Sequence, residues 1–436
     1  MNKENKPAPG RWREIFQKIT AATGKRFLAF ALLALFVVGV GSKFVPFQQM
    51  EDTELKQKIA SIMATDTEPS ADNCSGGFVY PELLRDIAQN NPDRPQIYLR
   101  NIFQTMELKT RSNEAREIAR LLGLPPSAVL YVEKKSGDLK VSMASGKAER
   151  KLYDAKNDYN LPGEFKRGEN GAATSDEVLN RAFEYSGLMR EFIRVTLARN
   201  SIDDRGMDLI SSVHYGVDYN NAFWNSEQMT YGDGDKDIFN NFVLIDVVGH
   251  ELAHGITEHT SGLRYYKQSG SLNEHYSDVA GICLKQWYLK QQPSEDEKIW
   301  RIGDEIWGPG VKSEKVKSLR NMRYPGTAYE HERIGKDKQP DHMDRYVVTD
   351  KDNGGVHINS GICNKAFVLA TLKMGGPAWE KPWQIWSRAN FKYTKENSQF
   401  VDFANATIKA SKDLYPKEPA VQEAVRYGWT EVGVLK

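Results

Sequence analysis

The residues between Asp246 and Asp278 have the types and spacing of a metal centre. His250 and His254 stand four positions apart, with Glu251 directly after the first histidine. On an α-helix this spacing places both imidazoles on one face, one turn apart, where they can bind a single divalent metal. A neighbouring carboxylate can then deprotonate a metal-bound water. This HExxH arrangement therefore predicts zinc-dependent hydrolysis.

A catalytic zinc also needs a third protein ligand and an open fourth position. Glu274 follows His254 after twenty residues and can supply the third ligand. Asp278 stands four positions further on, where its carboxylate can accept a hydrogen bond from a ligand histidine. The three ligands would then come from two successive helices.

The segment that carries the two histidines has a helical pattern. Its apolar residues recur at helical spacing: Val243, Leu244, Val247, Val248 and Leu252. Asn240 or Asn241 is predicted to cap the start of the helix, and Gly262 stands where a helix would stop. The alternative is a buried helix with two histidines by coincidence, and Glu274 argues against it.

With these motifs the chain resembles the thermolysin family of gluzincin metalloproteases, and within it the protealysin-like branch. The resemblance covers roughly residues 151–436 and is densest in residues 213–281, 352–365 and 413–434. It implies an α+β fold of two lobes. A β-rich N-terminal lobe with the zinc helix would span residues 151–262, and a mainly α-helical C-terminal lobe would span residues 263–436.

The resemblance also implies the activity of a zinc metalloendopeptidase that hydrolyses internal peptide bonds. His250, His254 and Glu274 would bind one Zn²⁺, and Glu251 would act as general base on a zinc-bound water. The other implied catalytic residues are Tyr265 and His357, which stabilise the oxyanion, and Asp352, which orients His357. Asp278 and Asn273 would support the ligand histidines.

Substrate contacts are implied by the same resemblance. They are expected from Asn221, Ala222, Trp224, Arg320, Val247, Ile302 and Leu319. Asn221 and Ala222 belong to a strand that would pair with an extended peptide through main-chain bonds, which needs no particular substrate sequence. Arg320 would hold a substrate carbonyl, and Val247, Ile302 and Leu319 would line an apolar S1′ pocket.

The chain departs from the family pattern at a double calcium site. The acidic positions of that site correspond here to Asp246, Lys285, Ile299, Arg301 and Asp304. Basic or apolar residues in three of the five positions are incompatible with calcium. We expect this site to be absent, with Lys285 or Arg301 pairing with Asp246 and Asp304. The Gly-Asp stretch at residues 231–235 looks like a calcium loop, but a turn explains it equally well, so calcium binding elsewhere stays open.

Composition narrows the class of protein. The 436 residues allow two or three domains, and a net charge of +1 gives no basic footprint for nucleic acid. Three cysteines cannot make a disulfide scaffold.

The N-terminal region predicts export. Residues 1–26 are polar and mostly basic, which is typical of a cytoplasmic N-terminus, and the apolar segment at residues 27–46 begins with fifteen uncharged residues. That segment is either a cleaved signal peptide or a retained membrane anchor, and both place the enzyme outside the cytoplasm. Residues 47–69 are polar and are predicted to be a linker.

Residues 70–150 are expected to form an inhibitory prosegment, so that the enzyme is made as a zymogen. Pro81 begins a short amphipathic helical pattern, as in the short prosegments of protealysin-like precursors. Cleavage would fall near residues 145–151. Cys74 is a candidate latency switch because a thiolate binds zinc well, but a simple packing role is the alternative.

Two other functions compete with the endopeptidase. A zinc metalloaminopeptidase shares HExxH but carries a Gly-x-Met-Glu-Asn motif that this sequence lacks. A membrane-tethered, non-catalytic binding module with a structural zinc would have no use for Glu251 as a base. The expected partners are peptide or protein substrates, the chain's own prosegment and, through residues 27–46, a membrane.

Overall fold

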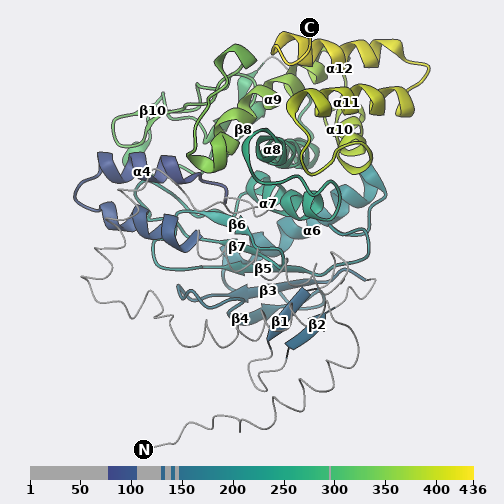
Figure 1. Ribbon diagram of the computed structural model, residues 1–436. Coiled ribbons are helices and arrows are strands. Elements are labelled where there is room, and N and C mark those ends of the chain that lie inside the picture. The colour runs from purple at the N-terminus through teal and green to yellow at the C-terminus, as the bar shows by residue number, and fades with distance from the viewer. Residues whose placement is uncertain (1–76, 106–128, 133–138, 143–146, 294–295) are drawn as a thin grey trace, which may run out of the picture.

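The computed structural model describes residues 77–105, 129–132, 139–142, 147–293 and 296–436 (Figure 1). The predicted cytoplasmic N-terminus, apolar segment and linker lie outside these residues, as does Cys74. Within them the predicted α+β architecture is confirmed, with a sheet at one end of the molecule and a helical lobe at the other.

A five-stranded sheet forms the N-terminal lobe, in the order β4-β3-β5-β7-β6. Its strands are β3 (Arg150–Asp154), β4 (Glu164–Arg167), β5 (Leu209–Val213), β6 (Ala222–Trp224) and β7 (Met229–Tyr231). β3, β5 and β7 run parallel, while β4 and β6 are antiparallel edge strands. A separate hairpin joins β1 (Val129–Val132) to β2 (Leu139–Ser142). The edge strand β6 carries two of the predicted substrate residues, Ala222 and Trp224, and Asn221 directly precedes it.

Two helices pack on this sheet. α6 (Glu177–Leu197) contacts β3 and β5, and its start is capped by Asp176, which accepts hydrogen bonds from the backbone N–H groups of Val178 and Leu179. α7 (Ile245–Glu258) contacts β6 and β7 and is buried along almost its whole length. It is the predicted zinc helix, and it lies between the two lobes (Figure 1).

The prediction that Asn240 or Asn241 caps α7 is wrong. The N-cap is Leu244, without a side-chain cap. Asn241 instead accepts a hydrogen bond from the Val243 N–H, and Asn240 donates to the carbonyls of residues 305 and 307. Both amide side chains thus form hydrogen bonds in the loop before α7. The chain is still extended at Leu244, so the helix begins only after it. Past the helix end, Gly262 adopts a φ of +62° and donates to the Thr257 carbonyl, which closes the turn.

α7 packs closely against α8 (Lys267–Leu289) because two glycines face each other. A Cβ atom on Gly249 would lie 3.0 Å from the Gly281 Cα, and one on Gly281 would lie 2.4 Å from the Asp246 carbonyl oxygen. Side chains at either position would therefore force the helices apart. This close packing allows residues of the two helices to meet at one point.

The C-terminal lobe is mainly helical, as predicted. It comprises α8, α9 (Asp352–Met374), α10 (Lys381–Lys392), α11 (Phe400–Leu414) and α12 (Pro419–Glu431). Short antiparallel pairs join β8 (Arg301–Ile302) to β9 (Arg320–Asn321) and β10 (Glu330–His331) to β11 (Gly335–Lys336). Three 3₁₀ turns, η2 (Glu297–Trp300), η3 (Pro309–Val311) and η4 (Met343–Arg345), complete the connections.

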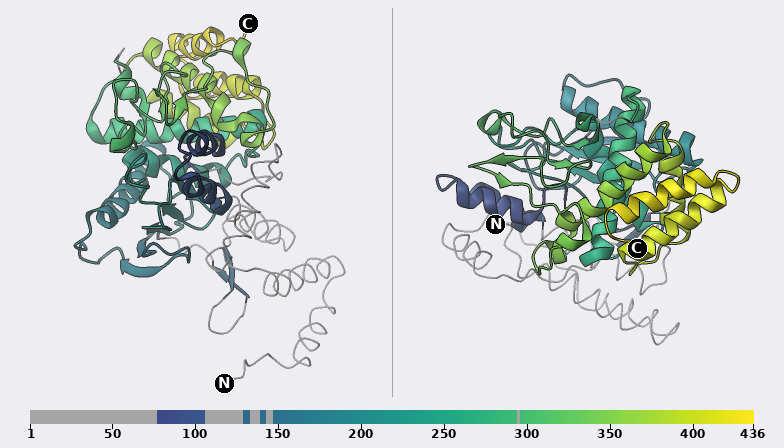
Figure 2. Two further views of the ribbon diagram at one scale, coloured as in Figure 1. Left: turned by 90° about the vertical axis from the view of Figure 1, so that its left-hand side faces the viewer. Right: turned by 90° about the horizontal axis from the view of Figure 1, so that it is seen from above.

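Residues 77–105 lie against both lobes. Pro81 begins α4 (Pro81–Asn90), as predicted, and residues 95–105 are also helical. In Figures 1 and 2 these purple helices cover one side of the junction between the sheet and the helical lobe. Phe78, Leu83, Leu84 and Ile87 are buried in the same hydrophobic core as α7. The segment is thus packed into the catalytic body.

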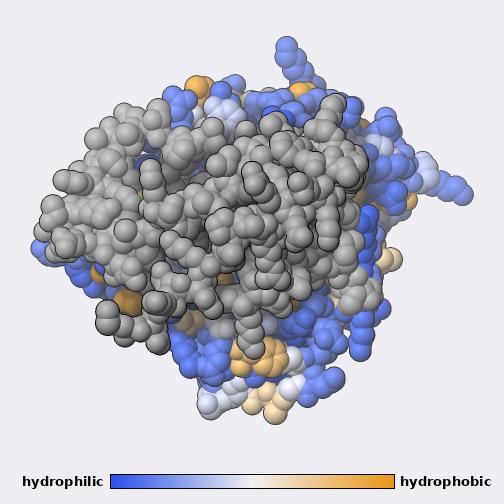
Figure 3. All heavy atoms as spheres, turned by 60° about the horizontal axis from the view of Figure 1, so that its bottom comes forward, coloured by the Kyte–Doolittle hydropathy of each residue, from blue (hydrophilic) through white to orange (hydrophobic). Residues whose placement is uncertain are grey.

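On the face shown in Figure 3, the described residues are predominantly blue, with small separate hydrophobic groups. In the described part of the chain, every helix is too short or too polar to cross a membrane.

Candidate metal centre and active site

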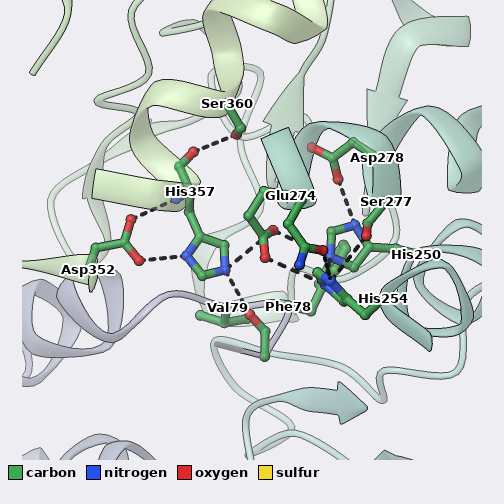
Figure 4. Close-up of polar contacts among 12 residues, drawn as sticks. Phe78, Val79, His250, His254, Glu274, Ser277, Asp278, Asp352, His357 and Ser360 are labelled. Carbon is green, nitrogen blue, oxygen red and sulfur yellow. Dashed lines mark hydrogen bonds and ion pairs between the residues drawn. The ribbon is translucent and has the colours of Figure 1, made fainter. Parts of the chain in front are cut away.

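The predicted ligands meet between α7 and α8. His250, His254 and Glu274 each offer one ligand atom, and these atoms all lie within 4.8 Å of one another (Figure 4). The two Nε2 atoms are 3.0 Å apart, and the Glu274 carboxylate oxygens lie 3.4 Å from His250 Nε2 and 3.5 Å from His254 Nε2. Three ligand atoms of types that zinc prefers thus face a common point.

Hydrogen bonds on the far side of each ring fix this orientation. His250 Nδ1 lies 2.8 Å from Asp278 Oδ1, and His254 Nδ1 lies 2.8 Å from Asn273 Oδ1. Ser277, which the sequence did not single out, adds a contact of 3.1 Å to His254 Nδ1. With Nδ1 donating to oxygen, each Nε2 keeps a lone pair for a metal. The roles expected of Asp278 and Asn273 agree with these contacts.

Asp278 is itself held by a buried arginine. Arg320 donates from Nε to Asp278 Oδ2 at 2.8 Å and from Nη2 to Oδ1 at 2.7 Å. Asn364 adds a bond of 2.9 Å to Oδ2. Burial alone would raise the pKa of Asp278, but the Arg320 charge and the His250 contacts hold it well below its usual range. The ionised carboxylate can therefore orient His250.

The ligand site is charged and buried, which fits a metal. Burial lowers the pKa of His254 to about 3, so this imidazole is neutral and able to bind. Burial alone would raise the pKa of Glu274, but the charge of His357 and the contact with His250 hold it far below its usual range. Glu274 Oε2 has no hydrogen-bond partner. A buried carboxylate oxygen beside two convergent imidazole nitrogens is suited to a cation.

Glu251 lies beside the ligands without a side-chain partner. Neither carboxylate oxygen makes a hydrogen bond within normal geometry, although the Trp224 backbone N–H favours its ionised form. Burial raises the pKa of Glu251 to about 7. A carboxylate with a pKa near neutrality can both take and return a proton, as a general base requires.

His357 and Asp352 form a second buried pair at the start of α9. Asp352 Oδ1 lies 2.6 Å from His357 Nδ1, and Asp352 Oδ2 accepts the His357 backbone N–H at 2.8 Å. The second bond satisfies a backbone N–H group in the first turn of the regular helix. This turn follows three residues in left-handed conformations, Asn353, Gly354 and Gly355. Asp352 thus fixes both the backbone and the ring of His357, in agreement with the orienting role expected of it.

Tyr265 reaches the same centre from the turn before α8. Its hydroxyl lies 3.2 Å from His357 Nε2 and donates a short hydrogen bond to Glu274 Oε1. The phenol thus lies between the ligand carboxylate and His357, where an oxyanion donor is expected, while its proton is directed at Glu274.

The strand edge at Asn221 and Ala222 pairs with residues 78 and 79 of the chain itself. The Phe78 N–H donates to the Ala222 carbonyl at 2.9 Å. Val79 makes two bonds with the Asn221 side chain, its N–H donating to Oδ1 at 2.8 Å and its carbonyl accepting from Nδ2 at 3.0 Å. These are the extended-peptide contacts that the resemblance implies for a substrate. No local pattern in the sequence indicated this role of residues 78 and 79.

Phe78 occupies the pocket next to the ligands. Arg320 Nη1 donates to the Phe78 carbonyl at 3.0 Å, and its guanidinium lies 4.5 Å from the centre of the Phe78 ring. The same ring meets His250 edge-on at 5.2 Å. A Cβ atom on Gly303 would lie 3.2 Å from the Phe78 ring and 3.3 Å from Leu319, so glycine leaves room for the aromatic ring.

The other substrate residues are placed as follows. Val247, Ile302 and Leu319 are buried, and Leu319 lies with the Phe78 ring beside Gly303. Trp224 lies on β6, but its indole N–H donates to Glu258 at 2.9 Å, away from the ligands. Tyr80, which sequence reasoning did not select, stacks on His357 with ring centres 5.7 Å apart. The sequence feature that could have pointed to Tyr80 is an aromatic residue two positions after Phe78.

A second charge cluster lies at the other end of the α7–α8 pair. Lys285 Nζ lies 3.1 Å from Asp246 Oδ2 and 2.7 Å from Asp304 Oδ1, which confirms the predicted ion pair. Arg301 pairs with Glu297 instead. Burial alone would lower the pKa of Lys285, but Asp246 and Asp304 raise it well above its usual range. An ammonium group thus lies where the resemblance places a calcium site.

Comparisons with known proteins agree with this geometry. Residues 130–258 match the model of the thermolysin metallopeptidase catalytic domain, and residues 261–434 match that of the thermolysin metallopeptidase alpha-helical domain. Protease PrtS of Photorhabdus sp. (strain Az29) is 39% identical over 344 residues, covering 78% of this chain and 91% of that protein. The Extracellular metalloprotease of Pectobacterium carotovorum is 44% identical over 294 residues, which are 67% of this chain and 83% of its own.

A solved structure is similar over an even larger part of the chain. The precursor of protealysin, a metalloproteinase from Serratia proteamaculans, is 38% identical, with a TM-score of 0.68 over 83% of this chain and all of that one. The resemblance to the protealysin-like branch is thereby confirmed. With both domain models matched in order and the ligand residues brought together, the chain belongs to the thermolysin metallopeptidase family.

Proposed function

We propose that the chain is a zinc endopeptidase made as a latent precursor, with His250, His254 and Glu274 as the zinc ligands. The observation that carries this proposal is the convergence of the three ligand atoms within 4.8 Å beside a buried, unpartnered Glu251. When bound there, zinc supplies Lewis acidity that activates water and polarises the scissile carbonyl.

The protein side chains do the proton chemistry in this proposal. Glu251 takes a proton from the attacking water and passes it to the leaving amine. His357, oriented by Asp352, donates to the developing oxyanion, and Tyr265, whose hydroxyl lies beside His357 Nε2, assists it. Asn221 and Ala222 align the peptide backbone, and Arg320 holds the carbonyl that follows the scissile bond.

We infer a preference for a large apolar residue directly after the cut. Phe78 occupies a pocket formed by His250, Arg320, Leu319 and the bare backbone of Gly303. Burying a phenylalanine side chain in this pocket contributes about 2 to 3 kcal/mol. A carboxylate in the same pocket would be buried without an unpaired cation to neutralise it, which is unfavourable. A peptide library that varies this position measures the preference, and favoured Asp or Glu would contradict it.

The latent state is also part of the proposal. Residues 70–150 would be the prosegment, with residues 151–262 and 263–436 as the two catalytic lobes and removal near residues 145–151. Residues 77–80 cover the ligands, Asn221 and His357, so external peptides have no access while they remain. Export through the segment at residues 27–46, as a signal or an anchor, agrees with the extracellular relative from Pectobacterium.

The test compares the zinc-loaded wild type with Glu251→Gln after prosegment removal, on casein and on an N-acetylated peptide. We expect Glu251→Gln to lower turnover by about 10²- to 10⁴-fold, because it removes the general base. The zinc content should be unchanged, since the side chain at position 251 is not one of the three ligands. Equal activity of the two proteins would reject the mechanism. Cleavage of the free but not the acetylated peptide would indicate an aminopeptidase.

A further inference from the structure

The peptide bond between Gly77 and Phe78 lies across the active centre in the position of a bond to be cut. On its carbonyl side, the Gly77 oxygen lies 2.9 Å from His357 Nε2. On its amine side, the Phe78 N–H donates to the Ala222 carbonyl. Figure 4 shows Phe78 and Val79 directly below the ligand side chains and His357.

The residues after this bond are held in the direction of a substrate. Arg320 holds the Phe78 carbonyl, the Phe78 ring fills the pocket, and Asn221 binds both polar backbone groups of Val79. Residues 77–79 therefore contact the groups that would stabilise the oxyanion, accept a hydrogen bond from the scissile N–H and select the side chain after the cut.

The rest of the segment fixes this position. Tyr80 donates to or accepts from Tyr329 at 2.9 Å, and Tyr98 donates to Asp235 at 2.7 Å. The Asn220 backbone N–H donates to Asn101 at 2.8 Å. Because these anchors lie after the bond, residues 78–105 would stay bound when the bond is broken.

We propose that the precursor cuts its own chain between Gly77 and Phe78. Water adds across the C–N bond: the oxygen joins the Gly77 carbonyl carbon to give a carboxylate, and the Phe78 nitrogen leaves as an amine. Glu251 carries the proton from the water to that amine. The inference rests on the proposed endopeptidase activity and names the first bond it cuts. The cut separates residues 1–77, with their apolar segment, from the catalytic body.

Glycine is required directly before the bond. Gly77 has a φ of +79°, and a Cβ atom there would lie 2.7 Å from Asn221 Nδ2 and 3.0 Å from the Ala222 carbonyl oxygen. Any side chain would strain the backbone and displace the substrate strand. Gly376 offers a matched control because its φ is +78° and nothing lies within 4 Å of its Cβ position.

The experiment follows the full chain by intact mass after zinc is added to zinc-free protein. We expect a product that begins at Phe78, formed at a first-order rate that does not change with protein concentration. Glu251→Gln should stay uncut, even when mixed with wild type. Gly77→Ala should be cut about tenfold more slowly or worse, whereas Gly376→Ala should match wild type.

The outcomes separate the two proposals. Wild type that cleaves an N-acetylated peptide after prosegment removal, although the Gly77–Phe78 bond of its precursor stays intact, would overturn the inference and leave the endopeptidase standing. A Phe78 terminus that appears equally fast in Gly77→Ala, or appears in Glu251→Gln mixed with wild type, would overturn cutting within one molecule. Zinc-loaded protein that neither cuts the Gly77–Phe78 bond nor, after prosegment removal, cleaves the peptide would reject the proposed function itself.

Discussion

The α7–α8 pair carries two buried charge clusters that satisfy their charges in different ways. At one end Asp246 and Asp304 surround the Lys285 ammonium group, so the cation belongs to the chain. At the other end His250, His254 and Glu274 converge on one point, and Glu274 Oε2 and both Glu251 oxygens make no hydrogen bond. The first cluster is complete in the folded chain, and the second is built to receive an ion.

We infer from this difference which of the two kinds of metal site a lysine can replace. A cation that only neutralises carboxylates can be replaced by lysine. A cation that must also activate water cannot, because an ammonium group has no open coordination position and no Lewis acidity. The predictions below test this division.

Removal of zinc should have the largest effect on stability. A ligand present at a thousand times its dissociation constant stabilises the native state by about 4 kcal/mol. We therefore expect a zinc chelator to lower the melting temperature strongly in calorimetry. A calcium chelator, with zinc buffered, should leave it unchanged if Lys285 fully replaces that ion. A large drop with the calcium chelator would show that another calcium site exists.

His275, on α8 next to Glu274, should cause a loss of stability in acid. It is fully buried between Asn364 and Trp386, and burial lowers its pKa from 6.5 to about 4. The unfolded chain therefore binds a proton that the folded chain does not, so stability falls as the pH drops from 6.5 to 4. The loss is about 3 kcal/mol, measurable by urea unfolding.

The matched variant for that prediction is His275→Gln, compared with His331→Gln at a more exposed site. His275→Gln should reduce the pH dependence across this window by the share that His275 contributes, whatever the absolute stability of the variant, because the buried imidazole at position 275 is gone. His331→Gln should keep the wild-type slope. An unchanged slope in His275→Gln would assign the acid sensitivity to other groups.

Lys285→Met should destabilise the chain by about 2 kcal/mol. It leaves Asp246, which is fully buried, without its cation, although the Gly303 N–H still donates to it. The estimate lies below the usual cost of a broken buried pair because Asp304 is one-third exposed. Urea unfolding measures the change, with Lys290→Met as a control at an exposed position. Equal stability would mean that the ion pair contributes little.

The stabilisation of Lys285→Glu by calcium should be the smallest and most specific of these effects. Three carboxylates at Asp246, Asp304 and position 285 would offer oxygen ligands of the kind that calcium binds. We expect the melting temperature of this variant to rise by a few degrees with calcium, about 1 kcal/mol, whereas wild type stays constant. A variant that does not respond to calcium would show that Ile299 and Arg301 also prevent binding.

The sequence predicted the metal ligands well because their spacing alone constrains them. His250 and His254 share a helix face by geometry, and Asp278 follows Glu274 by one turn. The two lobes followed from the family resemblance, and α4 followed from Pro81 and the amphipathic pattern after it. Local patterns of this kind need no knowledge of distant contacts.

The features that the sequence did not predict depend on distant contacts. Gly77 and Phe78 lie about 140 to 240 residues from their partners Ala222 and Arg320, and no local pattern links them. The start of α7 was misplaced because Asn241 binds within its own loop instead of the helix. Trp224 was assigned to substrate because its neighbours match the family strand, yet its indole is turned to Glu258.

The glycine pair at the crossing of α7 and α8 has a consequence for evolution of the chain. A methyl group at residue 249 or 281 would act as a wedge, and both histidines would move away from the glutamate together. Substitutions that raise helix propensity at these two positions would therefore displace the ligands, although alanine is a better helix former than glycine by about 1 kcal/mol. The close contact between α7 and α8 therefore limits how far substitutions can raise the helix propensity of either helix.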